Sequence, residues 1–218
     1  VSLMLLLASA LSFMDRQVLS ISIIRIKDDL HITDTEYGFI NSGFLISYAV
    51  MFTLGGMLID KYGSRLGLAF SVGFWSLATA LHALSMNAFH FGLFRFLLGV
   101  GEGGCFPGAI KAVIEWVPKQ KHAIANGIAI GGSAIGAVVA VPLCAFTLNY
   151  TNWRVLFLIS GVLGLIWVLC WLRMTNKYAK EQNQIVNKVS HSLKMSDFVA
   201  LFRNRDALLF ILIRFLLD

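Results

Sequence analysis

Long uninterrupted hydrophobic runs dominate the chain and predict helices that cross a membrane. Each run is close to the ~20 residues that an α-helix needs to span ~30 Å of hydrocarbon. The runs are about twice as long as a transmembrane barrel strand and lack strict alternation, so helices are favoured over strands. Six such segments are predicted: Val1–Ile24, Phe39–Ile59, Leu66–Leu84, Phe91–Ile114, Ala123–Leu148 and Val155–Leu172.

A seventh hydrophobic run begins at Ala207, after the long polar stretch 175–205. Because the sequence opens on Val1 and stops inside this run, we expect a fragment of a larger protein. The stretch 175–205 is interpreted as a loop between two halves, and Leu193–Phe202 fits either a short helix on the membrane surface or a flexible linker. Three parts are expected: a transmembrane bundle over 1–174, the loop over 175–205, and the truncated start of a seventh helix over 206–218.

Basic residues predict the orientation of the segments, because cytoplasmic loops are enriched in Lys and Arg. The loops on one side carry Lys61, Arg65, Lys119, Lys121, Arg173, Lys177, Lys180, Lys188, Lys194, Arg203 and Arg205. The opposite loops carry Arg25, Lys27 and Arg154. The N-terminus is therefore expected in the cytoplasm. The net charge of +6 then reflects topology and attraction to anionic lipid, and no nucleic-acid partner is expected.

Four charged residues interrupt the apolar segments: Asp15, Arg16, Arg95 and Glu102. A charge at the middle of a membrane costs roughly 2.5–3.5 kcal/mol on insertion scales, so the four must pair with one another or line a wet cavity. Two acids and two bases sum to zero. Such a neutral group is typical of a pathway for a proton and an anion.

The spacing of these charges limits how they can pair. Arg95 and Glu102 are seven residues apart, which is two helical turns, so they share one face, and that face must be interior. Asp15 and Arg16 are adjacent and point about 100° apart, so two partner helices are implied. Asp15 facing Arg95 is one arrangement among several that the sequence leaves open. A purely structural ion pair is the alternative to a transport role.

The segment Gly99-Val-Gly-Glu-Gly-Gly104 matches the spacing of a dinucleotide-binding fingerprint, but it lies inside a spanning segment and lacks the strand that such a site requires. The glycines instead predict close helix packing. The fifth segment repeats the pattern, so these two segments are expected to pack through their glycine faces, with a kink at Pro142. The three cysteines are interpreted as small hydrophobes and the five histidines as interfacial rings. No enzyme activity, cofactor or metal site is expected.

The short loop between the second and third segments contains an acid at a helix C-terminus, where the helix dipole disfavours it. This acid needs a cationic partner or the N-terminus of another helix, and such a contact can form in one conformation and break in another. The loop is therefore expected to act as a conformational latch. Its residues are Gly56, Asp60, Lys61, Gly63 and Arg65.

This loop matches the signature G-x-x-x-D-[RK]-x-G-x-[RK] of the major facilitator superfamily, which the chain resembles over nearly its whole length. Arg95-x-x-x-Gly99-x-x-Glu102 and the pair Asp15-Arg16 resemble the anion:cation symporter branch, and within it the hexuronate transporters. The resemblance implies a twelve-helix protein of two six-helix halves, of which this chain is the first, with a substrate site between them at the midplane. It also implies a multi-pass protein of the bacterial inner membrane and a monomer once both halves are joined.

The resemblance also implies roles for individual residues. The proton-coupling acids fall on Asp15 and Glu102, and the residues that bind the substrate fall on Arg16, Tyr48 and Arg95. Relatives commonly have Asn where Ile130 stands, so Ser133 or Asn126 is expected to supply that polar contact.

The function expected from the resemblance is proton-coupled uptake of a sugar-acid anion such as galacturonate or glucuronate by alternating access. The partners are then a small carboxylate, protons and the lipid bilayer. Two alternatives stay open at this point. One is an exchanger or facilitator for an aldarate, a dicarboxylate or an aromatic acid, and the other is a membrane receptor that does not transport.

Overall fold

Helices make up nearly all of the residues that the computed structural model describes, which are 1–176 and 208–209. The α-helices are α1 (Ser2–Leu30), α2 (Asp34–Tyr62), α3 (Ser64–Leu81), α4 (Ala88–Glu102), α5 (Cys105–Trp116), α6 (His122–Tyr150) and α7 (Trp153–Asn176). Two 3₁₀ turns, η1 (His82–Leu84) and η2 (Lys119–Lys121), precede α4 and α6. The remainder of the expected loop and seventh helix, including Leu193–Phe202, lies outside the described residues.

The expected all-α membrane fold is confirmed, because the described residues contain six segments long and apolar enough to cross a membrane. Each segment is longer than its predicted hydrophobic run, because flanking residues continue the helix at one end or at both. The fourth segment differs from the prediction because it is divided into α4 and α5 at Gly103 and Gly104. At Gly103 a Cβ atom would lie 2.7 Å from the carbonyl oxygen of Tyr48, so only glycine allows this approach of α2.

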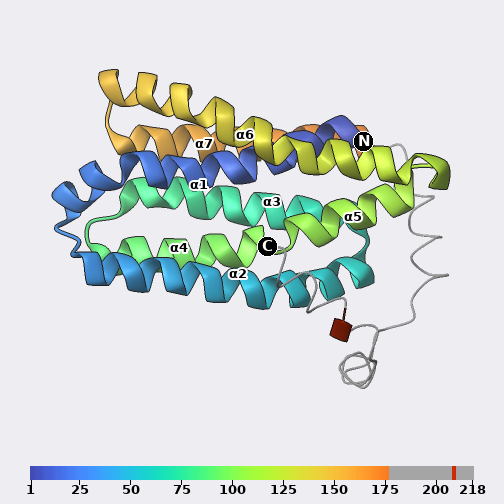
Figure 1. Ribbon diagram of the computed structural model, residues 1–218, viewed down its shortest axis with the longest axis horizontal. Helices are drawn as coiled ribbons and strands as arrows, with labels where there is room; N and C mark the ends of the chain where they lie inside the picture. Colours follow the sequence, from blue (N-terminus) through green and yellow to red (C-terminus); the bar gives the residue numbers. More distant parts are fainter. Residues whose placement is uncertain (177–207, 210–218) are drawn as a thin grey trace.

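The helices run side by side along the long axis of the molecule (Figure 1). α1 packs mainly on α6, α2 on α4, and α3 on α7. The connection between α2 and α3 lies at the same end as the connection between α5 and α6 (Figure 1). The turns that join α1 to α2, α3 to α4, and α6 to α7 lie at the other end. Every loop of the bundle therefore belongs to one of two opposite ends.

Local sequence explains where the helices begin and end. Thr33 caps α2 through a capping box, in which its hydroxyl accepts from the backbone N–H of Glu36 and the Glu36 carboxylate accepts from the backbone N–H of Thr33. Asn87 caps α4 by accepting from the backbone N–H of His90 at 2.9 Å. Between α2 and α3 the chain turns on Gly63 alone, whose φ of 82° lies in the left-handed region that glycine tolerates.

The glycine-rich helices pack on other partners than expected. Cβ atoms at Gly132 and Gly136 would overlap the backbone of Leu6 and Ala10, so this face of α6 lies against α1. A Cβ atom at Gly101 would lie 2.6 Å from the backbone nitrogen of Trp75 on α3. The prediction that the fourth and fifth segments pack through their glycine faces is therefore wrong, because each glycine face fits a different neighbour. α6 continues through Pro142 as one helix.

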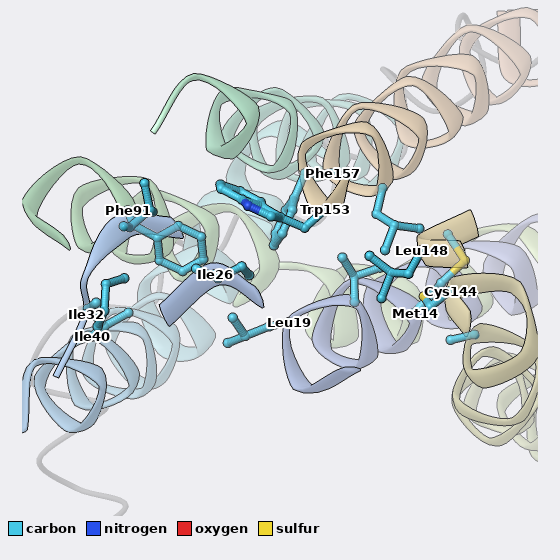
Figure 2. Packing of buried hydrophobic residues seen from close by; sticks show 14 residues of the cluster. Met14, Leu19, Ile26, Ile32, Ile40, Phe91, Cys144, Leu148, Trp153 and Phe157 are labelled. Atoms are coloured by element: carbon cyan, nitrogen blue, oxygen red, sulfur yellow. The ribbon is translucent and has the colours of Figure 1, made fainter. Parts of the chain in front are cut away.

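An apolar core near the end of the bundle that holds Trp153 gathers side chains from five of the helices (Figure 2). Phe91 and Trp153 both pack edge to face on Phe157, with ring centroids 6.0 Å and 5.8 Å away. His82 is fully buried against Phe91 and Phe157, at 4.9 Å from each ring centroid. The interfacial interpretation is wrong for His82, because these aromatic rings enclose it.

Candidate functional site

Arg16 and Glu102 form an ion pair between the first and fourth membrane segments. The Arg16 Nε donates to Oε1 of Glu102 at 2.9 Å, and the hydroxyl of Ser12 donates to the same oxygen. The Glu102 side chain is 1% exposed and that of Arg16 is 31% exposed. The pair therefore joins a buried acid to a base that reaches toward the surface of the bundle.

Asp15 points away from this pair, as the adjacent positions on α1 required. Its carboxylate accepts hydrogen bonds from Thr79 on α3, at 3.2 Å, and from Ser160 on α7. Asp15 forms no ion pair within the described part of the chain. Of the arrangements that the sequence left open, the structure thus does not adopt the pair between Asp15 and Arg95. Two hydroxyl groups solvate this buried acid instead.

Arg95 is a buried cation, and not all of its N–H groups have a hydrogen-bond partner among the described residues. It is 2% exposed, and its Nε and Nη2 atoms have no hydrogen-bond partner among the described residues. Its guanidinium carbon lies 5.8 Å from the ring centroid of Phe44 and 6.0 Å from that of Phe91. The acids that act on it electrostatically are Glu102 and Asp15. A buried cation with free donors is costly unless an anion accepts from it.

Aromatic rings surround the guanidinium of Arg16. Its central carbon lies 4.9 Å from the ring centroid of Tyr48, 5.0 Å from that of Phe13 and 5.7 Å from that of Phe44. Cation–π contacts of this kind hold an arginine in place while its N–H groups stay available to an acceptor. The residues that the structure brings together here are Asp15, Arg16, Tyr48, Arg95 and Glu102.

Ser133 is not joined to this cluster by any hydrogen bond that the structure records in residues 1–176. Its hydroxyl donates to the carbonyl oxygen of Ile130, one turn earlier on α6, at 2.7 Å. This is the ordinary local bond of a helical serine. The expected role of Ser133 in substrate binding remains a prediction.

Sequence analysis missed three hydroxyl groups that hold the acids: Ser12, Thr79 and Ser160. Ser12 carried a usable signal, because it lies one helical turn before Arg16 and so shares its face. Thr79 and Ser160 carried none, since each is a small polar residue within an apolar run. Only the packing of α3 and α7 on α1 identifies them.

The acid of the predicted latch has the cationic partner that its position demanded. Asp60 forms an ion pair with Lys111 on α5 at 3.0 Å, and Lys111 lies 3.8 Å from Glu115. Glu115 in turn accepts from the backbone N–H of Ser64 at 3.2 Å and from its hydroxyl at 2.6 Å. Lys111 lies inside the fourth hydrophobic run and should have been counted with the other embedded charges.

The other end of the latch loop contacts α7. Arg65 donates from Nε to the hydroxyl of Thr175 at 3.2 Å and from Nη2 to the side-chain oxygen of Asn176 at 3.4 Å. Lys61 lies over the ring of Tyr62, with its Nζ 5.3 Å from the centroid. The loop is thus held to α5 on one side and to α7 on the other.

The remaining polar groups give no metal centre within the described residues, where no three His, Cys, Asp or Glu side chains are grouped to hold an ion. The cysteines are free thiols, with Cys105 and Cys144 buried and Cys170 exposed.

The family model described as Major Facilitator Superfamily matches residues 5–217. A hexuronate transporter of Bacillus subtilis (strain 168) is 33% identical over 194 residues, which cover 89% of this chain and 45% of that protein. A galacturonate transporter of Dickeya chrysanthemi is 29% identical over 179 residues, covering 82% and 52%. The chain spans about half the length of these curated relatives.

Solved structures show the same fold. A bacterial homolog of the human lysosomal transporter Spinster, in an inward-facing and occupied conformation, superposes with a TM-score of 0.72 at 24% identity, over 80% of this chain and 43% of that chain. A proton:xylose symporter superposes with a TM-score of 0.68 at 15% identity, over 92% and 51%. In both cases the described bundle corresponds to about half of the other chain.

Proposed function

Because the chain belongs to the major facilitator superfamily, we propose that it forms one half of a proton-coupled symporter that takes up a sugar-acid anion such as a hexuronate. Members of this superfamily are transporters, so movement of a solute across the membrane is expected here and enzymatic conversion is not. The names of the relatives, which are hexuronate and galacturonate transporters, support a carboxylate sugar as the substrate class.

The observation that carries the proposal is the buried guanidinium of Arg95 with two unpaired nitrogen atoms. A planar guanidinium presents two parallel N–H groups that fit the two oxygens of a carboxylate. Arg16 lies close by, and its Nη2 atom is also unpaired within the described residues. In this proposal Arg95 grips the carboxylate of the sugar acid, and Arg16 and Tyr48, whose guanidinium and ring lie 4.9 Å apart, complete the substrate site.

Proton coupling follows from the charge of the cluster. Asp15, Arg16, Arg95 and Glu102 sum to zero without substrate, and an incoming carboxylate makes the sum −1. A low-dielectric site resists an uncompensated charge, so the loaded site favours uptake of one proton. We assign that proton to Glu102, because its Oε2 atom has no partner in residues 1–176 and it shares Arg16 with the substrate. Asp15 is the second proton-coupling acid of the proposal.

The conformational cycle is assigned to the latch. Asp60 is half-exposed at the end of the bundle and bonded to Lys111, so its contact can break without unfolding a helix. We place this end in the cytoplasm, together with the N-terminus, because the loops there are the basic ones. The complete transporter is proposed to be a monomer in the bacterial inner membrane.

The test uses the complete transporter in liposomes that contain a pH-sensitive dye. Addition of galacturonate or glucuronate outside should acidify the interior and should build up substrate when a proton gradient is imposed. Substrate-for-substrate exchange without acidification indicates an exchanger, and binding without any movement indicates a receptor. Either result contradicts the proposed symport. An aldarate, a dicarboxylate and an aromatic acid, tested in parallel, define the substrate class.

A further inference from the structure

A line of buried polar side chains leads from Asp15 on α1 to the last turn of α3, and from there through η1 to the connection with α4. Thr79 donates to Asp15, and His82 and Ser85 follow at intervals of three residues. Thr79 on α3 and His82 at the start of η1 are three residues apart in continuous helical turns, so they lie on the same side. Ser85 follows η1 in an extended conformation, and its backbone N–H donates to the carbonyl oxygen of His82 at 3.0 Å. All three are at most 1% exposed.

Two atoms of this line are unpaired. Within the described residues, neither the Nε2 atom of His82 nor the hydroxyl of Ser85 has a hydrogen-bond partner. The Nδ1 atom of His82 lies 2.8 Å from the carbonyl oxygen of Ala78, and because a carbonyl only accepts, Nδ1 carries the proton of this bond. In a neutral ring Nε2 is then a bare acceptor. Buried polar atoms normally form hydrogen bonds with protein groups or with ordered water. Ordered water is therefore the expected partner of both atoms.

The surroundings of His82 hold its ring in one orientation. The ring is stacked on Phe157 at an angle of 13° and meets Phe91 edge to face. The charged groups that face this line come from three helices: Asp15 and Asp29 from α1, Arg95 from α4 and Arg154 from α7.

The end of the line is closed by an ion pair. Arg154 pairs with Asp29 and also donates to the backbone carbonyl of Ser85 at 3.1 Å. This pair covers the last buried member of the line at the end of the bundle opposite to Gly63. The ion pair between Arg154 and Asp29 lies at the surface, so the two side chains can separate and let water reach Ser85. The packed aromatic rings around His82 move less easily.

We propose that Thr79, His82 and Ser85 form the path by which protons reach Asp15 from the end of the bundle closed by Arg154 and Asp29. A proton from water near Ser85 binds to Nε2 of His82 and makes an imidazolium. The same N–H then gives its proton, through water, to the hydroxyl of Thr79, which passes its own proton to Asp15. The ring returns to its neutral form and the carboxylate becomes a carboxylic acid. This inference rests on the proposed proton-coupled function.

The first test compares His82→Phe with His90→Phe in the complete transporter. Phenylalanine keeps the aromatic packing of His82 but cannot carry a proton, and His90 lies at the same end of the bundle outside the line. We expect His82→Phe to keep substrate-for-substrate counterflow within about twofold of the unmutated protein and to slow proton-driven uptake at least ~100-fold, the lower limit for a lost acid–base group. His90→Phe should leave both rates unchanged.

Two outcomes overturn the path. Proton-driven uptake at the normal rate in His82→Phe shows that protons reach the acids another way. An equal fall of counterflow and proton-driven uptake shows that His82 is structural only. Ser85→Ala, which removes one hydroxyl and little volume, should slow proton-driven uptake selectively in the same direction.

A second test needs no substitution. Deuterium exchange at the C2 carbon of each histidine ring, read by mass spectrometry in the unmutated protein, reports access of water to that ring. For a water-connected line, His82 should exchange within ~10-fold of His90, and slower exchange, typical of a sealed core position, overturns the path. If the unmutated transporter shows no proton-driven accumulation at all, the proposed function fails and this inference fails with it. If the unmutated transporter accumulates substrate and His82→Phe does so at the same rate, the proton path is refuted and the proposed function stands.

Discussion

Arg16 and Glu102 share a single hydrogen-bonded contact, from Nε to Oε1 at 2.9 Å, while Nη2 of the arginine and Oε2 of the acid stay unpaired within the described residues. Each side chain of the pair thus keeps one buried polar atom that is free to bind another group. In the proposed function, Nη2 of Arg16 binds a substrate oxygen and Oε2 of Glu102 takes up the proton.

Glu102→Gln should separate binding from coupling. The amide keeps an oxygen that accepts from Arg16 and Ser12, but it cannot take up a proton. We expect substrate binding and counterflow to persist, binding to lose much of its pH dependence, and proton-driven accumulation to disappear. Binding, counterflow and uptake measured on the same purified mutant check this, and normal accumulation leaves Asp15 as the coupling acid.

The same substitution also tests a purely structural ion pair. Breaking a fully buried pair costs roughly 3–5 kcal/mol, but Arg16 is 31% exposed and keeps an acceptor in the glutamine. We therefore expect the midpoint of thermal unfolding to change little. A collapse of the folded protein in Glu102→Gln is the result that a structural role predicts.

Arg95→Lys should weaken substrate binding while the fold survives. Lysine keeps the charge but lacks the planar fork that grips two oxygens. The expected loss is about 10- to 100-fold in Kd, which corresponds to about 1.4–2.7 kcal/mol. Calorimetric titration of the purified protein measures it, with Arg173→Lys on the exposed end of α7 as the matched control. Unchanged affinity removes Arg95 from the substrate site.

Asp60→Asn should alter the transport cycle and leave substrate affinity intact, because Asp60 lies at the end of the bundle. Lys111→Met removes the other member of the pair. The Asp60 side chain is 49% exposed and its pair lies at the end of the bundle, so Asp60→Asn should shift the rate of cycling and not the fold. If the pair acts as one unit, the double mutant should be no slower than the slower single mutant. Loss of binding with a normal saturated rate contradicts the latch.

Glycines on α6 offer a stability test with an internal control. Alanine at Gly136 would place Cβ against the backbone of Ala10, which cannot move aside as a side chain could, so we expect a clear fall in thermal stability. Alanine at Gly127 meets nothing within 4 Å, and it should stabilise the helix by up to about 1 kcal/mol. Equal behaviour of the two mutants is incompatible with the packing of α6 on α1.

The sequence reveals the membrane segments and the embedded charges because both depend on local composition. It misses what depends on packing between distant segments. The adjacent positions of Asp15 and Arg16 correctly require two different partners, yet nothing local identifies Thr79 or Ser160 as the donors to Asp15. The position of Asp60 requires a cation or the N-terminus of another helix, and the structure supplies the cation. Lys111 is found only when α5 is placed beside it.

The packing partners of the glycines are also not predictable from the sequence. A stripe of small residues predicts close approach, but it does not name the helix that approaches. Gly136 lies against the backbone of α1 and Gly101 against the backbone of α3. Burial of His82 was missed for a similar reason, since its aromatic enclosure is built from α4 and α7.

The single-residue connection at Gly63 has a mechanical consequence. Residues 31–33 leave some slack between α1 and α2, but α2 and α3 are joined without any, so a displacement of one is transmitted to the other. α3 then works as a stiff lever about 27 Å long, at 1.5 Å per residue over its 18 residues. One end of α3 begins with Ser64, whose hydroxyl donates to Glu115, and Thr79 near the other end donates to Asp15. In the proposed cycle, a movement of the latch loop is therefore carried along α3 to the carboxylate of Asp15.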